Sequence, residues 1–306
     1  MAAIVTYTGY FFTGYAALVM FFHILGLISS KAAFVARSLA MYISILISSI
    51  FGLGAAVILS AIGKRGLSQW AVARCFKYCM YVGTGLTFDI EDPKNHLGTA
   101  RPAVFIGPHQ TEVDLLMLGC MFPQYCSVTA KSQLKKIPFL GWFMTLSGAV
   151  FIDRKNSKDA RQAMQGAGEE IKNKKQSVYM FPEGTRSYTK EPTMLPFKKG
   201  AFHLAVQAQV PIVPVVVANY SHIYSIKEML FKSGSVPCKV LDPIPTTGLT
   251  AADVDELTRE TREVMLKEMI ALTEKARGKT APQAAPLLKK QNGVTKASGS
   301  DMRVAA

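Results

Sequence analysis

Residues 1 to 88 contain no aspartate and no glutamate, although the chain has 306 residues and 21 acidic side chains. The same stretch carries six basic side chains, and residues 275 to 306 carry seven more against a single aspartate. The segment between them is nearly neutral, so the formal charge of +14 comes from the two ends. Basic ends beside apolar sequence are typical of contact with anionic lipid, whereas nucleic-acid-binding proteins place their basic residues on the folded domain. We therefore expect membrane lipids as partners and no nucleic acid.

The chain also lacks the short motifs of several large enzyme classes. It has no Gly-x-Ser-x-Gly nucleophile elbow, no Walker phosphate-binding loop and no paired metal-ligand motif, so we expect neither a metal nor a cofactor. The number of cysteines is odd and their spacing forms no zinc pattern: Cys75, Cys79, Cys120, Cys126 and Cys238. Such a set gives no disulfide framework and suits a reducing, cytosolic environment.

Two long uncharged runs dominate the N-terminal part of a chain whose mean hydropathy is +0.20. Residues 4 to 30 and 38 to 63 each exceed the roughly 20 residues that a helix needs to cross a bilayer. Lys31 and Arg37 occupy the expected connector. A signal peptide is disfavoured because the first run is too long, lacks a basic start and is followed by a second run. Residues 1 to 65 therefore predict a membrane helix pair, either a spanning hairpin or two helices dipping into one leaflet.

Alternating strand-like and helix-like segments follow over residues 66 to 275, which predicts an α/β domain with a mixed, mostly parallel sheet flanked by helices. Its first segment, 67 to 81, is amphipathic and fits a helix at the membrane interface or a buried domain helix equally. The two prolines of 210 to 217 suggest an edge strand. Residues 276 to 306 form a basic tail rich in Ala, Pro, Gln and Ser, which we expect to be disordered. Strands are expected near 86–90, 103–107, 125–130, 148–153, 177–181, 211–218 and 236–241, and helices near 112–121, 157–174, 198–208 and 251–275.

One loop carries a histidine and an aspartate five residues apart. Pro108 ends the apolar run before it, so His109 is expected in the loop and Asp114 in the first turns of the next helix. From there the carboxylate can reach one imidazole nitrogen and leave the other free to take a proton from a hydroxyl. A helix cap beside a surface histidine explains the spacing equally well.

Two further polar clusters follow predicted strands, where ligands of open α/β sheets gather. Arg154 ends the segment 148 to 154, and the segment 181 to 187 holds Glu183, Gly184 and Arg186. The two arginines could face one anion, because a guanidinium donates two aligned hydrogen bonds to phosphate oxygens. Taken singly, each cluster reads more simply as a salt bridge or an ordinary turn.

Four ordered blocks together resemble the glycerolipid acyltransferase family. They are His109-x4-Asp114, Phe151-Ile-Asp-Arg154, Phe181-Pro-Glu-Gly-Thr-Arg-Ser187 and Val210-Pro-Ile-Val-Pro-Val215. The resemblance covers roughly residues 66 to 245, and within the family it is greatest to the lysophosphatidic acid acyltransferases, particularly the fungal ones. The chain departs from the family at the first block, where Pro108-His109-Gln110-Thr111 replaces the usual Asn-His-Gln-Ser. We therefore expect Pro108 to affect the local shape of this loop.

The resemblance implies transfer of a fatty acyl group from acyl-CoA, a co-substrate rather than a cofactor, to the sn-2 hydroxyl of 1-acyl-glycerol-3-phosphate (lysophosphatidic acid). It implies that His109 is the general base and that Asp114 stabilises the imidazolium. A membrane location follows, at the endoplasmic reticulum or a lipid droplet, with the catalytic domain facing the cytosol. The residues expected to bind the phosphate and glycerol of the acceptor are Lys131, Arg154, Glu183, Gly184, Thr185 and Arg186.

Two alternatives stay open from the sequence. The acceptor could be glycerol-3-phosphate or another lysophospholipid, because the His-Asp chemistry is indifferent to the headgroup. The chain could also be a non-catalytic membrane-shaping or lipid-binding protein, although an intact His109 and Asp114 argue against it.

Overall fold

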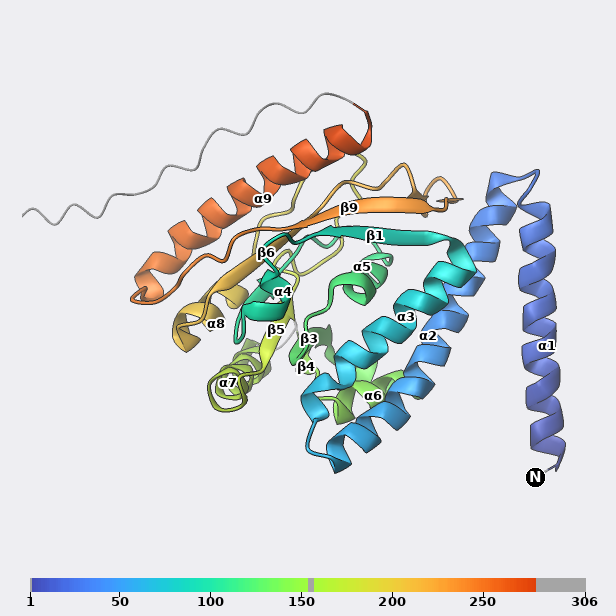
Figure 1. Cartoon of the computed structure of the whole chain (residues 1–306), viewed down its shortest axis with the longest axis horizontal. Helices are drawn as coiled ribbons and strands as arrows, with labels where there is room; N and C mark the ends of the chain where they lie inside the picture. The colour runs from blue at the N-terminus through green and yellow to red at the C-terminus, as the bar shows by residue number, and fades with distance from the viewer. Residues whose placement is uncertain (1, 154–156, 279–306) are drawn as a thin grey trace, which may run out of the picture.

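A seven-stranded sheet forms the centre of the computed structural model, which describes residues 2–153 and 157–278 (Figure 1). Its strands lie in the order β1-β9-β6-β2-β5-β3-β4, and β7 and β8 form a separate hairpin. The strands are β1 Leu86–Glu91, β2 Val104–Ile106, β3 Cys126–Lys131, β4 Val150–Ile152, β5 Ser177–Met180, β6 Ile212–Val217, β7 Tyr224–Ser225, β8 Leu230–Phe231 and β9 Gly234–Val240.

Five neighbouring strands of the sheet, β6, β2, β5, β3 and β4, are parallel. The remaining pair, β9 and β1, is parallel within itself and antiparallel to β6. The predicted mixed, mostly parallel sheet is thus confirmed. Because the five strands run the same way, their carboxyl ends meet at one edge of the sheet, where open α/β folds place their ligands.

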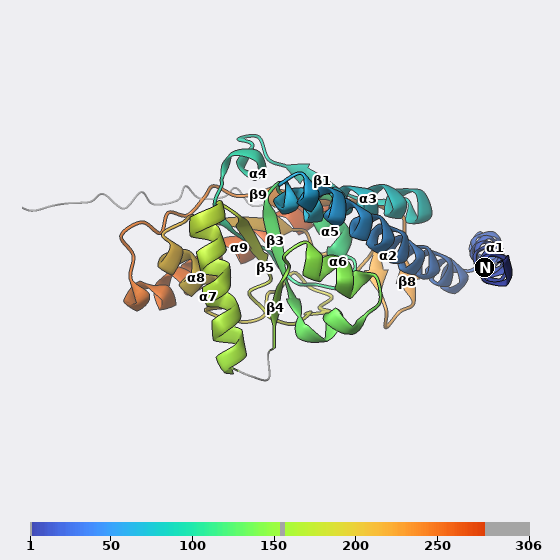
Figure 2. The same cartoon turned by 90° about the horizontal axis from the view of Figure 1, so that it is seen from below.

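Helices cover both faces of the sheet (Figures 1 and 2). α7, α8 and α9 pack on one face, and α3 and α5 pack on the other, with α2 and α6 outside them. The helices are α1 Ala2–Leu25, α2 Ser30–Ala61, α3 Ser68–Thr84, α4 His96–Thr99, α5 Asp114–Met121, α6 Leu140–Leu146, α7 Ser157–Lys174, α8 Gly200–Ala208 and α9 Val254–Ala276, with short 3-10 turns η1 Arg65–Leu67, η2 Ser132–Lys136 and η3 Ala251–Asp253.

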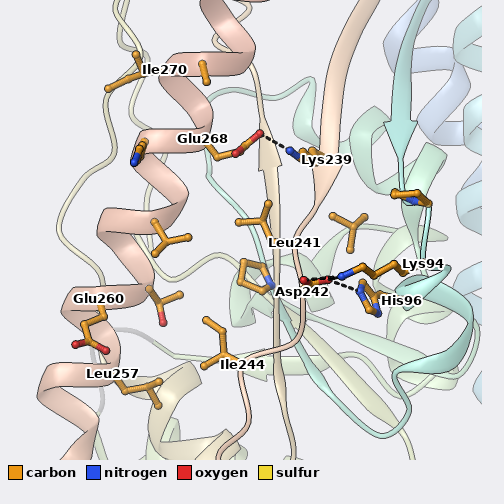
Figure 3. Close-up of a pocket in the computed structure, with 17 residues that line it drawn as sticks. Lys94, His96, Lys239, Leu241, Asp242, Ile244, Leu257, Glu260, Glu268 and Ile270 are labelled. Atoms are coloured by element: carbon orange, nitrogen blue, oxygen red, sulfur yellow. Dashed lines mark hydrogen bonds and ion pairs between the residues drawn. The ribbon is translucent and has the colours of Figure 1, made fainter. Parts of the chain in front are cut away.

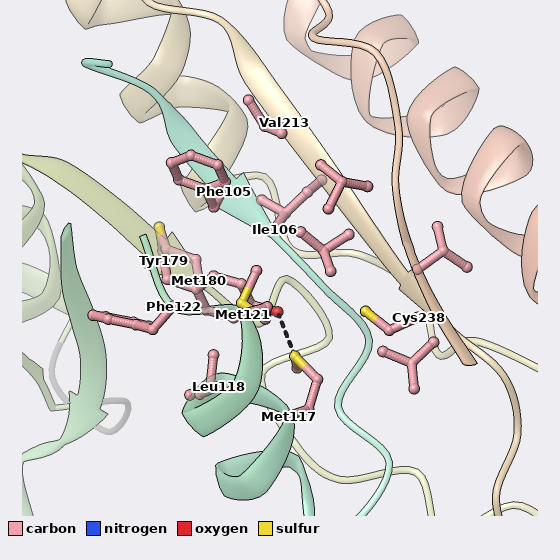
Figure 4. Close-up of a cluster of buried hydrophobic side chains, with 14 of the residues drawn as sticks. Phe105, Ile106, Met117, Leu118, Met121, Phe122, Tyr179, Met180, Val213 and Cys238 are labelled. Atoms are coloured by element: carbon pink, nitrogen blue, oxygen red, sulfur yellow. Dashed lines mark hydrogen bonds between the residues drawn. The ribbon is translucent and has the colours of Figure 1, made fainter. Parts of the chain in front are cut away.

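The core between β2, β5 and α5 is apolar and fully buried (Figure 4). Phe105 of β2 lies opposite Tyr179 of β5, and the Tyr179 hydroxyl lies 3.9 Å from Met117 Sδ of α5. Burial of side chains of this size contributes about 1.5–3 kcal/mol each. This packing fixes the end of β2 relative to the start of α5, the two points between which the histidine loop runs.

The first two helices are long and apolar enough to cross a membrane, over Thr6–Leu25 and Ser30–Ala61. α1 stands apart from the domain and touches it chiefly through α2 (Figure 1). α2 begins earlier than expected, so Lys31 and Arg37 lie inside the helix and not in a connector. Arg37 donates hydrogen bonds to the carbonyl oxygens of Thr84 and Phe231, which fastens α2 to the α/β domain.

α3 packs between α2 and α5 and has two different sides. Phe76 and Met80 are buried, whereas Tyr78, Tyr81 and Val82 are exposed. The segment expected near 67 to 81 is therefore a domain helix with an exposed aromatic stripe, and contact of that stripe with the membrane interface stays a prediction. The predicted tail lies outside the described residues from position 279 onward.

β6 lies inside the sheet between β9 and β2, so the expectation of an edge strand is wrong. The carbonyl of Pro214 faces β9, which places its missing N–H on the same side. There the antiparallel register slips by one residue, from Val215 opposite Val240 to Ile212 opposite Ile244. Such a bulge leaves one position unpaired, and a proline can occupy it without losing a ladder hydrogen bond.

Two glycines of α2 test whether this helix is part of the domain. A Cβ at Gly52 would lie 2.6 Å from Val72 and 2.8 Å from Phe143, whereas a Cβ at Gly54 would meet nothing within 4 Å. We expect Gly52→Ala to lower the free energy of unfolding by about 1–3 kcal/mol through overpacking. Gly54→Ala should be neutral or stabilise by up to about 1 kcal/mol. Thermal unfolding of both variants in detergent measures the difference, and equal midpoints would contradict the docking of α2.

Candidate active site

The candidate site lies where three adjacent parallel strands end. His109 follows β2, Glu183 follows β5 and Tyr220 follows β6. Lys131 is the last residue of β3 at the same edge, and its side chain is exposed. The sheet therefore gathers residues that are far apart in the sequence.

The contact expected between His109 and Asp114 is present. His109 Nδ1 lies 2.8 Å from Asp114 Oδ2. Asp114 is the first residue of α5, while His109 lies in the loop before it, so the carboxylate turns back from the helix to reach the ring. The same oxygen accepts the backbone N–H groups of Gln110 at 2.7 Å and Thr111 at 3.1 Å. Three donors thus hold one oxygen of a carboxylate that is only 1% exposed.

The second oxygen of Asp114 is held by a tyrosine from a distant part of the chain. Tyr220 donates its hydroxyl hydrogen to Asp114 Oδ1 at 2.6 Å, and Thr111 Oγ1 lies 2.9 Å from the same hydroxyl. Tyr220 is fully buried. Burial, followed by the charge of Asp114, raises the pKa of the Tyr220 phenol well above its usual value, so the phenol stays a donor. Both oxygens of the Asp114 carboxylate therefore accept hydrogen bonds from the protein.

The His109 ring is stacked and oriented. Phe181 lies parallel to it, with ring centroids 4.2 Å apart and an interplanar angle of 20°. The side chain keeps 17% of its surface exposed. Within the part of the chain that the structure describes, Nε2 makes no hydrogen bond. A neutral ring that donates from Nδ1 to Asp114 therefore leaves the lone pair of Nε2 free to accept a proton.

Glu183 holds the histidine loop through its backbone. Its Oε1 accepts the backbone N–H of His109 at 2.8 Å, and its Oε2 accepts that of Leu195 at 2.9 Å. The side chain is buried, which raises the pKa of the Glu183 carboxyl, and the two N–H groups oppose this rise. Both oxygens are thus engaged by the protein, an arrangement that differs from the expected contact with the glycerol of an acceptor.

The loop 181 to 188 is clamped along the histidine loop. Ser187 donates its N–H to the carbonyl of His109 at 2.9 Å, and Tyr188 donates to that of Gln110 at 3.1 Å. Gly184 adopts a φ of +71°, and a Cβ there would lie 2.9 Å from Lys198. A residue other than glycine would be strained at this position. Thr185 follows with an exposed side chain.

Arg186 does not stand free at the site. Its Nη1 donates to Glu112 Oε1 at 2.7 Å, and the hydroxyl of Tyr188 donates to the same oxygen at 2.5 Å. The Nε of Arg186 is buried and has no hydrogen-bond partner among the described residues. The guanidinium that we expected to bind an anion is thus paired with a carboxylate of its own chain. Arg154, its expected companion, lies outside the described residues.

Sequence reasoning missed Tyr220 and Glu112. Tyr220 lies three residues after the end of β6, so its place beyond a predicted strand end was a usable signal. Glu112 lies within the histidine loop itself, and no local pattern indicates that it faces Arg186.

Comparisons with known proteins show which family the chain resembles. A model of the Acyltransferase family matches residues 89–218. The chain is 43% identical over 230 residues to the 1-acyl-sn-glycerol-3-phosphate acyltransferase of Saccharomyces cerevisiae, with 75% of each chain covered. It is 40% identical over 230 residues to the human 1-acyl-sn-glycerol-3-phosphate acyltransferase beta, again with 75% of each covered. The crystal structure of the 1-acyl-sn-glycerophosphate acyltransferase of Thermotoga maritima matches the fold with a TM-score of 0.63 at 22% identity, over 83% of this chain and 100% of that one.

The fold and the relatives together define an α/β acyltransferase with two N-terminal helices that are long and apolar enough to cross a membrane. The chain belongs to the glycerolipid acyltransferase family, and its closely similar relatives carry the name of 1-acyl-sn-glycerol-3-phosphate acyltransferases. The resemblance read from the four sequence blocks is confirmed.

Proposed function

We propose that this protein transfers a fatty acyl group from acyl-CoA to the sn-2 hydroxyl of 1-acyl-glycerol-3-phosphate and so makes phosphatidic acid. The observation that supports this most is a histidine whose Nδ1 is held by a buried carboxylate and whose Nε2 has no hydrogen-bond partner among residues 2–153 and 157–278. The names of relatives covering three quarters of the chain supply the acceptor.

The proposed chemistry needs no nucleophile from the enzyme. His109 Nε2 takes the proton of the acceptor hydroxyl as its oxygen attacks the carbonyl carbon of the thioester. The new ester bond forms, the carbon–sulfur bond breaks, and the departing CoA sulfur takes the proton from the imidazolium. Asp114 stabilises the positive ring between these steps, because its hydrogen bond to Nδ1 is already in place.

Binding of the acceptor phosphate would exchange one anion for another at Arg186. The guanidinium is now paired with Glu112, so the phosphate must displace this carboxylate or share the cation with it. The unpaired Nε of Arg186 offers a further donor for an incoming oxygen. Lys131, the last residue of β3, belongs to the proposed set, with Gly184 and Thr185 on the loop that carries Arg186. Arg154 is proposed from the sequence alone, since it lies outside the described residues.

Glu183 acts in this proposal by positioning and not by touching the acceptor. It holds the backbone of His109 through one oxygen and that of Leu195 through the other. The loop with the general base and the segment after the Arg186 loop are thereby tied to one buried group.

We also propose a location in the membrane of the endoplasmic reticulum, or of lipid droplets derived from it, with the α/β domain facing the cytosol. Two apolar helices and five free cysteines in the described residues are consistent with this. Both substrates carry long acyl chains, so a site beside the bilayer shortens their path.

Acyl transfer by purified protein tests the proposal directly. With oleoyl-CoA and a panel of 1-acyl-glycerol-3-phosphate, glycerol-3-phosphate and neutral or choline lysophospholipids, we expect release of free CoA chiefly with the first. His109→Ala should lower kcat by about 10²–10⁴-fold, the usual contribution of a general base, while the protein stays in membranes. His203→Ala, on the exposed side of α8, is the matched control and should keep full activity. Full activity of His109→Ala would contradict the mechanism, and preference for another acceptor would contradict the substrate.

A second pair of variants tests the anion exchange at Arg186. Arg186→Ala should raise the Michaelis constant for the lysolipid by about tenfold or more, because charge-assisted hydrogen bonds to phosphate are lost. Glu112→Gln should lower it, since the competing charge is gone while the side-chain size is kept. Arg259→Ala on the exposed surface of α9 serves as control. A higher Michaelis constant in Glu112→Gln would show that Glu112 only supports Arg186 and does not compete with the phosphate.

A further inference from the structure

A group of large apolar side chains lies uncovered on the α/β domain itself. Ile137, Phe139, Trp142 and Leu146 of the segment around α6 are 43%, 36%, 52% and 43% exposed. Monomeric soluble domains seldom expose such a cluster without a partner. We call these four side chains, with the neighbouring Lys135 and Lys136, the α6 surface.

The segment that carries the α6 surface has charges of one sign. Residues 115 to 152 contain no aspartate and no glutamate, and their three basic residues are Lys131, Lys135 and Lys136. All three are exposed. Exposed aromatic and aliphatic side chains combined with lysines are the composition of a surface that lies at the boundary of an anionic bilayer.

The α6 surface is held rigidly. A Cβ at Gly141 would lie 2.2 Å from the carbonyl oxygen of Lys135, so the turn into α6 is closely packed. The rings of Phe139 and Trp142 meet edge to face with centroids 5.3 Å apart. Phe143, the residue after Trp142, is buried. The exposed rings are therefore presented by a fixed helix.

The α6 surface also adjoins the helix pair that enters the membrane. α6 packs directly against α2, with Phe143 beside Gly52 (Figure 2). Most of the apolar window of α2 is not buried by the domain, since only 28% of it is covered. Lipid in contact with the outward side of α2 would therefore also contact α6.

We infer that the α6 surface is a second membrane contact, in which Trp142 and its apolar neighbours enter an anionic leaflet while Lys135 and Lys136 meet its phosphates. The domain then rests on the bilayer independently of α1. η2 begins directly after Lys131, which ends β3 at the edge that carries His109. Contact at α6 therefore places this edge of the sheet at the level of the lipid headgroups.

A groove also lies between α9 and the segment after β9 (Figure 3). Apolar side chains such as Leu241, Ile244 and Leu257 line it, and Lys94, His96 and Asp242 form an ion-paired group at one end. Charges of both signs surround it, so it does not favour a lipid surface.

The two tryptophans of the chain, Trp70 and Trp142, allow a direct test. Trp70→Phe leaves Trp142 as the sole tryptophan of the full chain, which is reconstituted into phosphatidylcholine vesicles containing phosphatidylserine, with brominated or ordinary acyl chains. We expect the emission of Trp142 to shift to the blue, to be lost largely with brominated lipid, and to resist aqueous acrylamide. Trp142→Phe reports Trp70, which packs beside Arg74 and should be quenched far less by bromine. If Trp70→Phe does not fold, the difference between native protein and Trp142→Phe gives the same quantity.

Three outcomes are distinguished. Bromine quenching of Trp142 supports the inference. Quenching by acrylamide alone places Trp142 in water and overturns the inference. Resistance to both quenchers means that protein, such as a second copy of the chain, covers the α6 surface, and it overturns the inference as well. Lys135→Glu with Lys136→Glu should reduce the bromine quenching of Trp142 in these vesicles. None of these readouts depends on acyl transfer, so the proposed function can fail without affecting them.

Discussion

The carboxylate of Asp114 is the group on which the arrangement of the site depends. It accepts hydrogen bonds from the His109 ring, from two backbone N–H groups of the same loop and from Tyr220. His109 follows β2, Asp114 begins α5 and Tyr220 follows β6. The packing of these elements therefore sets the orientation of the His109 imidazole. A buried carboxylate is costly unless it is fully hydrogen-bonded, so the four donors stabilise the ionised group as well as orienting it.

Two properties of the proposed acceptor, its charge and its acyl chain, require different surroundings at this edge of the sheet. The proposed acceptor is an anion, which favours exposed arginine and lysine, and it is also a lipid, which favours an apolar surrounding. The fold separates these demands in space: Lys131 ends β3 and Arg186 lies in the loop after β5, whereas α1, α2 and the α6 surface present exposed apolar side chains. Glu112 compensates the charge of Arg186 in the structure.

Local sequence predicted much of this structure. The helix expected over 157 to 174 has those bounds, and Pro108 indicated correctly that His109 precedes the helix that Asp114 begins. The order of the strands could not be predicted from local sequence. The prolines of β6 suggested an edge strand, whereas β6 lies inside the sheet. The slipped register of the chain after β9 explains how a central strand accommodates Pro214.

The partners of the predicted site residues were equally hidden. Glu183 was recognised as part of the site, but its two backbone partners come from loops that are apart in the sequence. Tyr220 reaches Asp114 across 106 positions. Such contacts depend on which strands become neighbours, and a single sequence pattern does not contain that information.

The tautomer of His109 tests the central claim most directly. Nitrogen chemical shifts of ¹⁵N-histidine-labelled protein, with the His109 signals assigned by their loss in His109→Gln, report which ring nitrogen carries the proton. If Asp114 holds the ring as described, the neutral His109 ring carries its proton on Nδ1 and leaves Nε2 free, and Asp114→Asn removes this preference. A native His109 protonated at Nε2 would place its only free nitrogen against the carboxylate, and it would contradict the assignment of Nε2 as the base.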